Sequence, residues 1–201
     1  MNEHVRNPLP LAPRTESTRF ADGYPRRVWT ADELRQMVES GIMAEGEPFE
    51  LIGGELIAKM QKGIQHENLK RALNKYWGKI MPNHLEFVPE SPLRLGPHDE
   101  PEPDFFVFSA ETAMQDVRGP TVLLVVEIAD SSVHKDNSIK LMRYALQGVR
   151  EYWIVNARTR ETTVLHVPAE TGYALRREAP ADERLVPMFA PELAVRFADL
   201  K

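Results

Sequence analysis

The chain has 201 residues, no cysteine and a formal net charge of −5 at pH 7. This length predicts one domain, or one domain with tails, and the 42% hydrophobic content allows a packed core. The lack of cysteine excludes disulfides and thiolate chemistry and fits a cytoplasmic protein. No apolar run approaches the roughly 18 residues of a membrane span, and the N-terminal stretch lacks the apolar core of a signal peptide. The acidic balance argues against nucleic-acid binding by bulk charge alone but leaves room for a local basic patch.

The first 26 residues differ from the rest because prolines punctuate them without hydrophobic periodicity. We expect an extended, partly disordered arm at 1–26, followed by a single domain at 27–201. Within that domain, Thr30 begins a helix with a capping-type sequence. The stretch 49–57 then predicts a hairpin that turns at two glycines, Gly53 and Gly54.

A basic helix is expected from His66 to about Met81. Its apolar face is formed by Leu69, Leu73, Tyr76, Trp77 and Ile80. The stretch 59–81 contains six Lys or Arg and one Glu, so it is net +5 inside an acidic chain. Three of these cations recur every four residues and either follow a phosphate backbone or form an ordinary solvated face: Arg71, Lys75 and Lys79.

The remaining segments predict an α/β (α+β) fold with a mixed sheet. Strands are expected at 85–88, 93–95, 104–108, 122–128 and 151–155, a helix at 135–147, and a hairpin at 162–167 and 173–177. Gly148 is a natural residue for the left-handed position that ends this helix. The proline-punctuated tail at 185–200 is expected to pack on the surface.

Two carboxylates adjoin apolar runs that are typical of buried central strands. Asp104 precedes the run Phe105–Phe108, and Glu127 follows the run Val122–Val126. If these strands pair antiparallel, the start of one lies beside the end of the other, and the acids converge at one edge of the sheet. Like charges there are costly unless a proton or a cation neutralises them, and carboxylate oxygens suit a hard cation such as Mg²⁺. The pair therefore predicts a metal-dependent hydrolase.

Asp136, Lys140 and Tyr144 recur every four residues and form one polar stripe on the helix after Glu127. Because the intervening loop is short, Lys140 can reach toward the acids, where a lysine orients a metal-bound water and offsets charge on the attacked phosphate. The alternative is an Asp–Lys surface pair of little energetic consequence. The apolar residues of this helix are expected to face the core: Ile139, Met142 and Leu146.

Glu50 and His66 are further candidates whose roles the sequence leaves open. Glu50 is in phase with Ile52 and out of phase with Leu51. It is a buried acid that needs a partner if the Ile52 side faces the core, and an ordinary surface residue otherwise. His66 stands where a helix begins, so it could cap the helix, contact a phosphate, approach a metal or serve only the structure.

The ordered set Pro103-Asp104, Glu127 and Lys140 resembles the PD-(D/E)XK nuclease superfamily. More closely, residues 28–200 resemble the Uma family of restriction endonucleases. The matching stretches are 49–56, His66 at the head of its helix, 103–105, 126–132, 135–144 and 148–155. The most specific of them is the Asp-x-x-x-Lys-x-x-x-Tyr helix followed by Gly-Val-x-Glu-Tyr-Trp.

The resemblance implies a restriction-endonuclease-like core, in which helices flank a mixed β-sheet. It also implies Asp104 and Glu127 as Mg²⁺ ligands, Glu50 as an additional acid and Lys140 as the catalytic lysine. One departure from the superfamily pattern is that Ala129 stands where a lysine is expected two residues after the strand acid. Lys140 on the following helix fits the position that the family uses instead.

Three hypotheses follow. The first is a Mg²⁺-dependent endonuclease acting on DNA, with Mn²⁺ as a possible substitute, in which Tyr144 fixes Lys140 or a phosphate; by analogy with nucleases that cut both strands it would be a homodimer. The second is a catalytically idle module of the same fold that binds nucleic acid or protein. The third is a structural protein with solvated or paired acids, against which the combination of acids, lysine and tyrosine argues. A metal titration separates a retained site from none, and a cleavage assay separates an enzyme from a binder.

Overall fold

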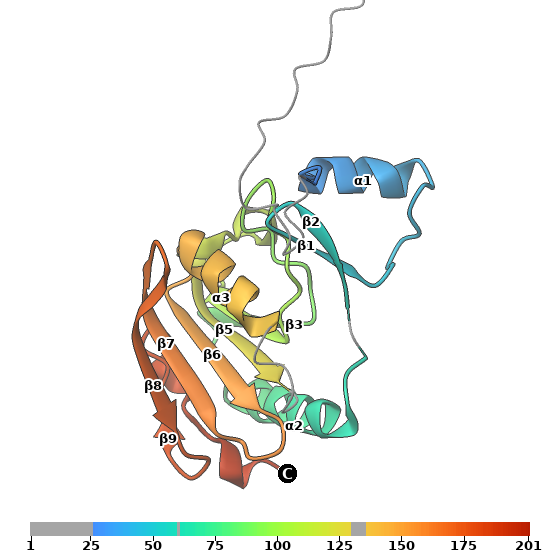
Figure 1. The fold of residues 1–201 in the computed structure, drawn as a ribbon. Helices are drawn as coiled ribbons and strands as arrows, with labels where there is room; N and C mark the ends of the chain where they lie inside the picture. Colours follow the sequence, from blue (N-terminus) through green and yellow to red (C-terminus); the bar gives the residue numbers. More distant parts are fainter. Residues whose placement is uncertain (1–25, 60, 130–135) are drawn as a thin grey trace, which may run out of the picture.

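The computed structural model describes residues 26–59, 61–129 and 136–201, with only the backbone of 136–138 described. In Figure 1 a twisted sheet carries a helix on each face, and a small hairpin with α1 lies to one side. Within these residues, no helix is both long and apolar enough to cross a bilayer. The expected arm at 1–26 lies outside the described residues except for its last one.

Six strands form one mixed sheet in the order β3-β4-β5-β6-β7-β8. Neighbours are antiparallel except β5 and β6, which run parallel and are joined through helix α3 (Asp136–Leu146). Parallel neighbours need such a crossover because a tight turn cannot connect them. The mixed fold expected from the sequence is thereby confirmed. The strands are β3 (Leu85–Pro89), β4 (Phe105–Ser109), β5 (Val122–Ala129), β6 (Glu151–Asn156), β7 (Thr162–Ala169) and β8 (Gly172–Ala179).

Strands β4 and β5 are neighbouring interior strands of the sheet and are buried on both faces. This double burial explains their continuous apolar sequences, because neither face meets water. Their pairing is antiparallel, and Phe105 lies opposite Val126. Asp104, one residue before Phe105, is therefore carried to Glu127, one residue after Val126. The convergence expected of the two acids is confirmed.

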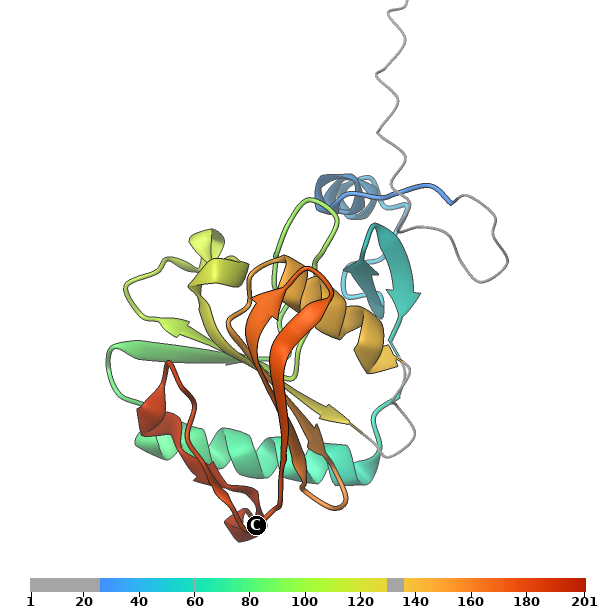
Figure 2. The ribbon, with the colours of Figure 1, turned by 60° about the vertical axis from the view of Figure 1, so that its left-hand side comes forward.

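The two long helices cover opposite faces of the sheet (Figures 1 and 2). Helix α2 (Ile64–Ile80) packs its apolar stripe onto one face, where Trp77 meets Phe105 edge to face. Helix α3 lies on the other face, where Tyr144 packs on Tyr152. Apolar side chains along both elements supply the burial that stabilises this three-layer arrangement.

A second, two-stranded sheet lies beside the main one and consists of β1 (Phe49–Ile52) and β2 (Glu55–Ala58). Its turn uses Gly53 and Gly54 with φ of +61° and +81°, the left-handed backbone that a two-residue hairpin turn requires of both positions. Helix α1 (Ala31–Glu39) precedes it and begins with the expected capping box, in which Thr30 and Glu33 satisfy each other's backbone N–H groups. Both elements thus follow the sequence prediction.

Helix α3 is oriented differently from the sequence prediction. Ile139, Met142 and Leu146 were expected to face the core, but 54%, 45% and 49% of their surfaces are exposed. The side turned toward the sheet instead carries Lys140 and Tyr144. Lys140 and Tyr144 face the sheet because they hydrogen-bond to buried acids there, Glu127 and Glu50. Hydrophobic periodicity alone does not take such polar partners into account.

The strand expected at 93–95 is also absent from the described chain. Leu93 and Leu95 are buried in the core on the α3 side, which accounts for their apolar character. Their backbones bond to a neighbouring loop, however, with Leu93 N–H donating to Pro101 at 2.8 Å and Leu95 N–H to Asp99 at 3.0 Å. The segment is a buried loop that closes on residues 99–101 rather than a strand of the sheet.

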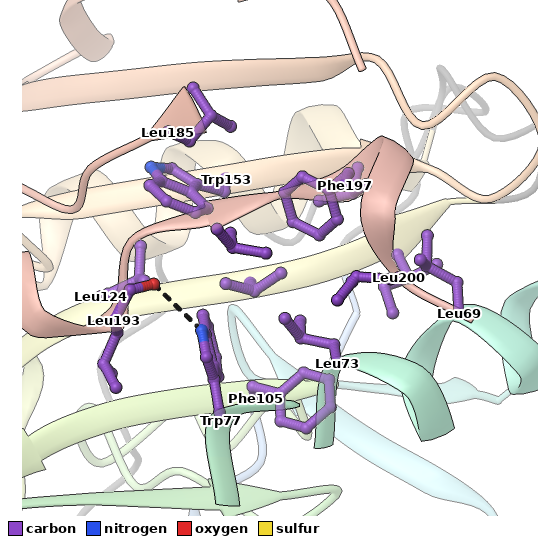
Figure 3. Packing of buried hydrophobic residues seen from close by; sticks show 14 of the residues in the cluster. Leu69, Leu73, Trp77, Phe105, Leu124, Trp153, Leu185, Leu193, Phe197 and Leu200 are labelled. Atoms are coloured by element: carbon purple, nitrogen blue, oxygen red, sulfur yellow. Dashed lines mark hydrogen bonds between the residues drawn. The ribbon is translucent and has the colours of Figure 1, made fainter. Parts of the chain in front are cut away.

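The C-terminal tail is part of the core and not a surface attachment. Trp77 donates its indole N–H to the Leu193 carbonyl at 3.0 Å, and Phe197 packs edge to face on Trp153 (Figure 3). Segments 185–200 thus close the α2 side of the sheet, a correction to the sequence prediction. They contain β9 (Arg184–Leu185), β10 (Val195–Arg196) and 3₁₀ turns at Pro191–Leu193 and Phe197–Asp199; two more 3₁₀ turns lie at Met114–Asp116 and Gly119–Thr121.

Truncating a tail side chain tests this correction. We expect Phe197→Ala to lower the free energy of unfolding by about 3–5 kcal/mol, because it opens a cavity in the core. Val186→Ala, at a tail position that is 51% exposed, should change it by less than about 0.5 kcal/mol. Urea denaturation of both variants measures the difference. Equally small changes in the unfolding free energy of the two variants would support the sequence prediction that the tail packs on the surface.

Glu151 ties the tail to β6 and makes stability depend on pH. Its buried carboxylate accepts hydrogen bonds from the Trp153 indole and the Met188 backbone N–H, both at 2.7 Å. Burial raises the pKa of Glu151 from 4.5 to about 7. The folded state therefore keeps a proton that the unfolded chain has already lost.

This contribution to stability is present below pH 4.5 and is lost as pH rises through about 7. We expect wild type to lose on the order of 2–3 kcal/mol more unfolding free energy than Glu151→Gln between pH 5 and pH 7.5. Urea unfolding at both pH values measures this. Burial lowers the pKa of nearby His166, which acts in the opposite direction, but that residue is retained in both proteins. Parallel pH profiles would contradict the expectation.

Candidate active site

Asp104 is the most deeply held of the predicted acids. Only 1% of its surface is exposed. Its Oδ2 accepts the Ile128 backbone N–H at 2.7 Å and lies 3.0 Å from Nε2 of His66, while Oδ1 accepts a hydrogen bond from Lys62 at 2.7 Å. Strand β5, helix α2 and the chain before α2 thus converge on one carboxylate.

Glu127 lies on β5 next to Asp104 and points toward α3. Its Oε1 accepts hydrogen bonds from Lys140 at 3.0 Å and from the Tyr144 hydroxyl at 3.1 Å. Lys140 and Tyr144 are four residues apart, so they project from the same side of the helix onto one oxygen. The reach of Lys140 to the acids, expected from spacing alone, is present in the structure.

Glu50 joins the same cluster from the hairpin. It lies on β1 and is buried, as are both Leu51 and Ile52, so the choice between two faces does not arise at this strand. Its Oε1 accepts hydrogen bonds from Lys140 at 3.0 Å and from the Glu102 backbone N–H at 2.9 Å. Lys140 therefore bridges two acids from separate sheets.

Glu127 and Asp104 are electrostatically unequal. The pKa of Glu127 is raised to about 7, because burial together with the charges of Asp104 and Glu50 outweighs the opposing effect of Lys140. Burial would also raise the pKa of Asp104, but the hydrogen bonds and charges of His66 and Lys62 outweigh it and hold that pKa below its usual value. The site thus contains one firmly ionised acid beside one that titrates near neutrality.

His66 lies inside the site rather than on the protein surface. Its exposed surface is 3%, and its ring nitrogens lie 3.2 Å from Glu67 and 3.0 Å from Asp104. In this position it can orient Asp104, whereas contact with a phosphate requires the surrounding chain to move. The predicted basic stripe is separate from it: Arg71, Lys75 and Lys79 lie on the exposed side of α2.

Two site residues were missed by sequence analysis. Lys62 was counted only as part of a basic stretch, yet it donates to Asp104 at 2.7 Å and to Glu90 at 2.9 Å. Asp99 has no exposed surface and accepts hydrogen bonds from Arg143 of α3, from Gln147 just after that helix and from the Gly53 backbone. A buried acid in a loop has no periodic sequence signal, and only the contacts identify it. The side chain of Asp136 lies outside the described residues.

The acids and lysines form a compensated polar cluster. Among the residues that the structure describes, no three His, Asp or Glu side chains are arranged to hold a metal ion. In this arrangement the ammonium groups of Lys62 and Lys140 pair with Asp104, Glu127 and Glu50 and offset part of their charge. The cluster nonetheless presents carboxylate oxygens, the donors that hard cations prefer.

Comparisons with known proteins assign the chain to a family. A profile of the Uma2 family, described as "Putative restriction endonuclease", matches residues 31–198. The fold is similar to the crystal structure of a "putative nuclease belonging to DUF820" from Anabaena variabilis, with a TM-score of 0.63 and 18% identity over 85% of this chain and 96% of that one. No protein with a curated description matches the chain.

Removing the bridging ammonium should expose the cost of the buried acids. We expect Lys140→Met to lower the unfolding free energy by about 3–5 kcal/mol at pH 8 in EDTA, since two carboxylates lose their counterion. The loss should be smaller at pH 5, where Glu127 with its pKa of about 7 is protonated. Adding Glu127→Gln should restore part of the stability.

The matched control is Lys79→Met, which removes an exposed lysine from α2. Urea unfolding of wild type and the three variants at both pH values makes the comparison. A Lys140→Met protein as stable as Lys79→Met at pH 8 would show that the bridge contributes nothing.

Proposed function

This chain belongs to the Uma2 family, described as "Putative restriction endonuclease", and we propose that it is a Mg²⁺-dependent endonuclease that hydrolyses phosphodiester bonds in DNA. The observation that carries the proposal is the position of Lys140, whose Nζ lies 3.0 Å from both Glu127 and Glu50 at the edge where Asp104 also lies. An ammonium fixed beside several acids is what a hydrolase needs to orient water near a charged phosphate.

The acids fit a hard divalent cation by their chemistry. Mg²⁺ is commonly bound through one or two carboxylates while it keeps several waters, so a full protein cage is not required. Asp104 and Glu127 would hold it, with Glu50 as the additional acid. When bound, the ion would polarise the scissile phosphate and lower the pKa of a coordinated water. Mn²⁺ has the same oxygen preference and could replace it.

The protein's own groups would position the reactants. Lys140, held between two glutamates, would orient the attacking water or offset charge that develops on the phosphate. Tyr144 donates to Glu127 and so fixes the oxygen to which Lys140 also binds. His66 would orient Asp104 through the contact between Nε2 and Oδ2.

The basic face of α2 supports a nucleic-acid substrate. Arg71, Lys75 and Lys79 lie on the exposed side of the helix whose first turn holds His66, so a phosphate backbone bound along them would lead toward the acids. We further propose a cytoplasmic homodimer, by analogy with nucleases that cut both strands.

Cleavage of plasmid and single-stranded DNA with Mg²⁺ or Mn²⁺ tests the proposal. We expect Asp104→Ala and Lys140→Ala each to lower the rate by at least about a hundredfold. Asp116→Ala, which removes an exposed acid, is the control for charge and for contaminating activity. Thermal unfolding of each variant checks that it is folded.

Cutting that survives Asp104→Ala would place the activity in another protein or another site. If folded wild type binds the metal through Asp104 but cuts neither DNA, a catalytically idle binding module on this fold becomes the better account.

A further inference from the structure

Lys62 contacts the candidate site from its solvent side. Its side chain is 34% exposed, against 17% for Lys140, and it comes from the chain just before α2 rather than from the helix that carries Lys140. Its Nζ lies 2.7 Å from Asp104 Oδ1 and 2.9 Å from Glu90 Oε1. The same ammonium therefore has two acidic partners, of which only Asp104 is a proposed metal ligand.

The second partner is held in an unusual backbone conformation. Glu90, immediately after β3, has a φ of +45°, a region that residues with a Cβ rarely occupy. Strain of this kind persists only where the surrounding structure enforces it and is concentrated at functional sites. Here the backbone N–H of Glu90 donates to the Asp104 carbonyl at 3.2 Å, so the two acids are held side by side.

Glu90 also has a cation of its own. Lys70 of α2 lies 2.7 Å from Glu90 Oε1 and 2.7 Å from Glu67 Oε2. Glu90 therefore keeps Lys70 as a partner whether or not Lys62 bonds to it. If another cation binds Asp104, Lys62 can keep its hydrogen bond to Glu90. The hydrogen bonds and charges of Lys70 and Lys62 keep the pKa of Glu90 below its usual value, against the effect of burial.

We propose that Lys62 is a displaceable counterion of the metal site: it neutralises Asp104 in the metal-free protein and moves onto Glu90 when a divalent cation binds Asp104. The inference rests on the proposed metal site and adds a role for two residues that the sequence did not single out. Two cations that share one carboxylate oxygen repel each other strongly, so metal binding has to shift the ammonium. The bond to Glu90 lets Lys62 leave Asp104 and still keep an acidic partner.

This arrangement has a functional consequence. Because Lys62 pairs with Asp104, this acid can stay ionised in the folded protein without a metal. A metal that binds Asp104 must then compete with Lys62. The protein then binds the ion more weakly than its carboxylates alone would allow, and removal of Lys62 should strengthen binding.

The experiment is calorimetric titration of the metal-free protein with Mn²⁺, without DNA. We expect Lys62→Gln to bind Mn²⁺ about tenfold or more tightly than wild type, because a positive charge leaves the ligand Asp104. Glu90→Gln should bind more weakly, because Lys62 then has only Asp104. In the double variant the effect of Glu90→Gln should disappear.

Two matched controls separate this role from general charge effects. Lys59→Gln removes the same charge nearby, but Lys59 pairs with Glu102 and not with Asp104. Lys70→Gln removes the other cation from Glu90. We expect both to bind Mn²⁺ within about twofold of wild type, since neither competes for Asp104.

Each outcome bears on a different claim. If Asp104→Asn and wild type both fail to bind Mn²⁺, the proposed metal site fails first. If wild type binds through Asp104 but Lys62→Gln binds no more tightly, or only as Lys59→Gln does, the displaceable counterion is refuted while the metal site stands. A weakening by Glu90→Gln that persists in the Lys62→Gln background would also refute it, because Glu90 would then act by its own charge.

Discussion

The bridge that Lys140 makes between Glu127 and Glu50 is the interaction on which this architecture depends. Three acids meet at one end of a sheet, where burial makes uncompensated charge very costly. One ammonium with 3.0 Å contacts to two of them joins the main sheet, the β1–β2 hairpin and α3. A buried ion cluster of this kind is weak evidence for a gain in stability over apolar packing, so we propose that the acids are kept for the chemistry of the site, and that the bridge is what makes their burial tolerable.

The rest of the fold positions that bridge. Asp99 accepts hydrogen bonds from Arg143 of α3, from Gln147 just after the helix and from the Gly53 backbone of the hairpin turn, so the C-terminal part of α3 is fixed against the hairpin. On the opposite face, α2 is fixed to the tail through the bond from Trp77 to Leu193 and delivers His66 to Asp104. Two helices on opposite faces of one sheet (Figure 2) thus contribute to the candidate site, α2 with His66 and α3 with Lys140 and Tyr144.

Much of this was predictable from sequence where the signal was local or periodic. The paired central strands, the hairpin glycines and the i, i+4 spacing of Lys140 and Tyr144 were enough to bring four site residues together. Prediction failed where distant contacts decide. Ile139 of α3 was assigned to the core because apolar residues are usually inside, but the buried acids attract the polar side of the helix instead.

Contacts between residues distant in the sequence also explain why the position of the tail and the role of Lys62 were not predicted. A proline-punctuated segment resembles a surface attachment, and only the three-dimensional contacts show that Phe197 fills the gap beside Trp153. Lys62 lies in an irregular stretch with no period, so its pairing with Asp104 depends on how the chain enters α2. Both failures concern residues whose contact partners are distant in the sequence. Because the clustered acids are buried, the folded protein needs Lys62 and Lys140 beside them, and a metal of the kind proposed would have to compete with these two lysines for the same carboxylates.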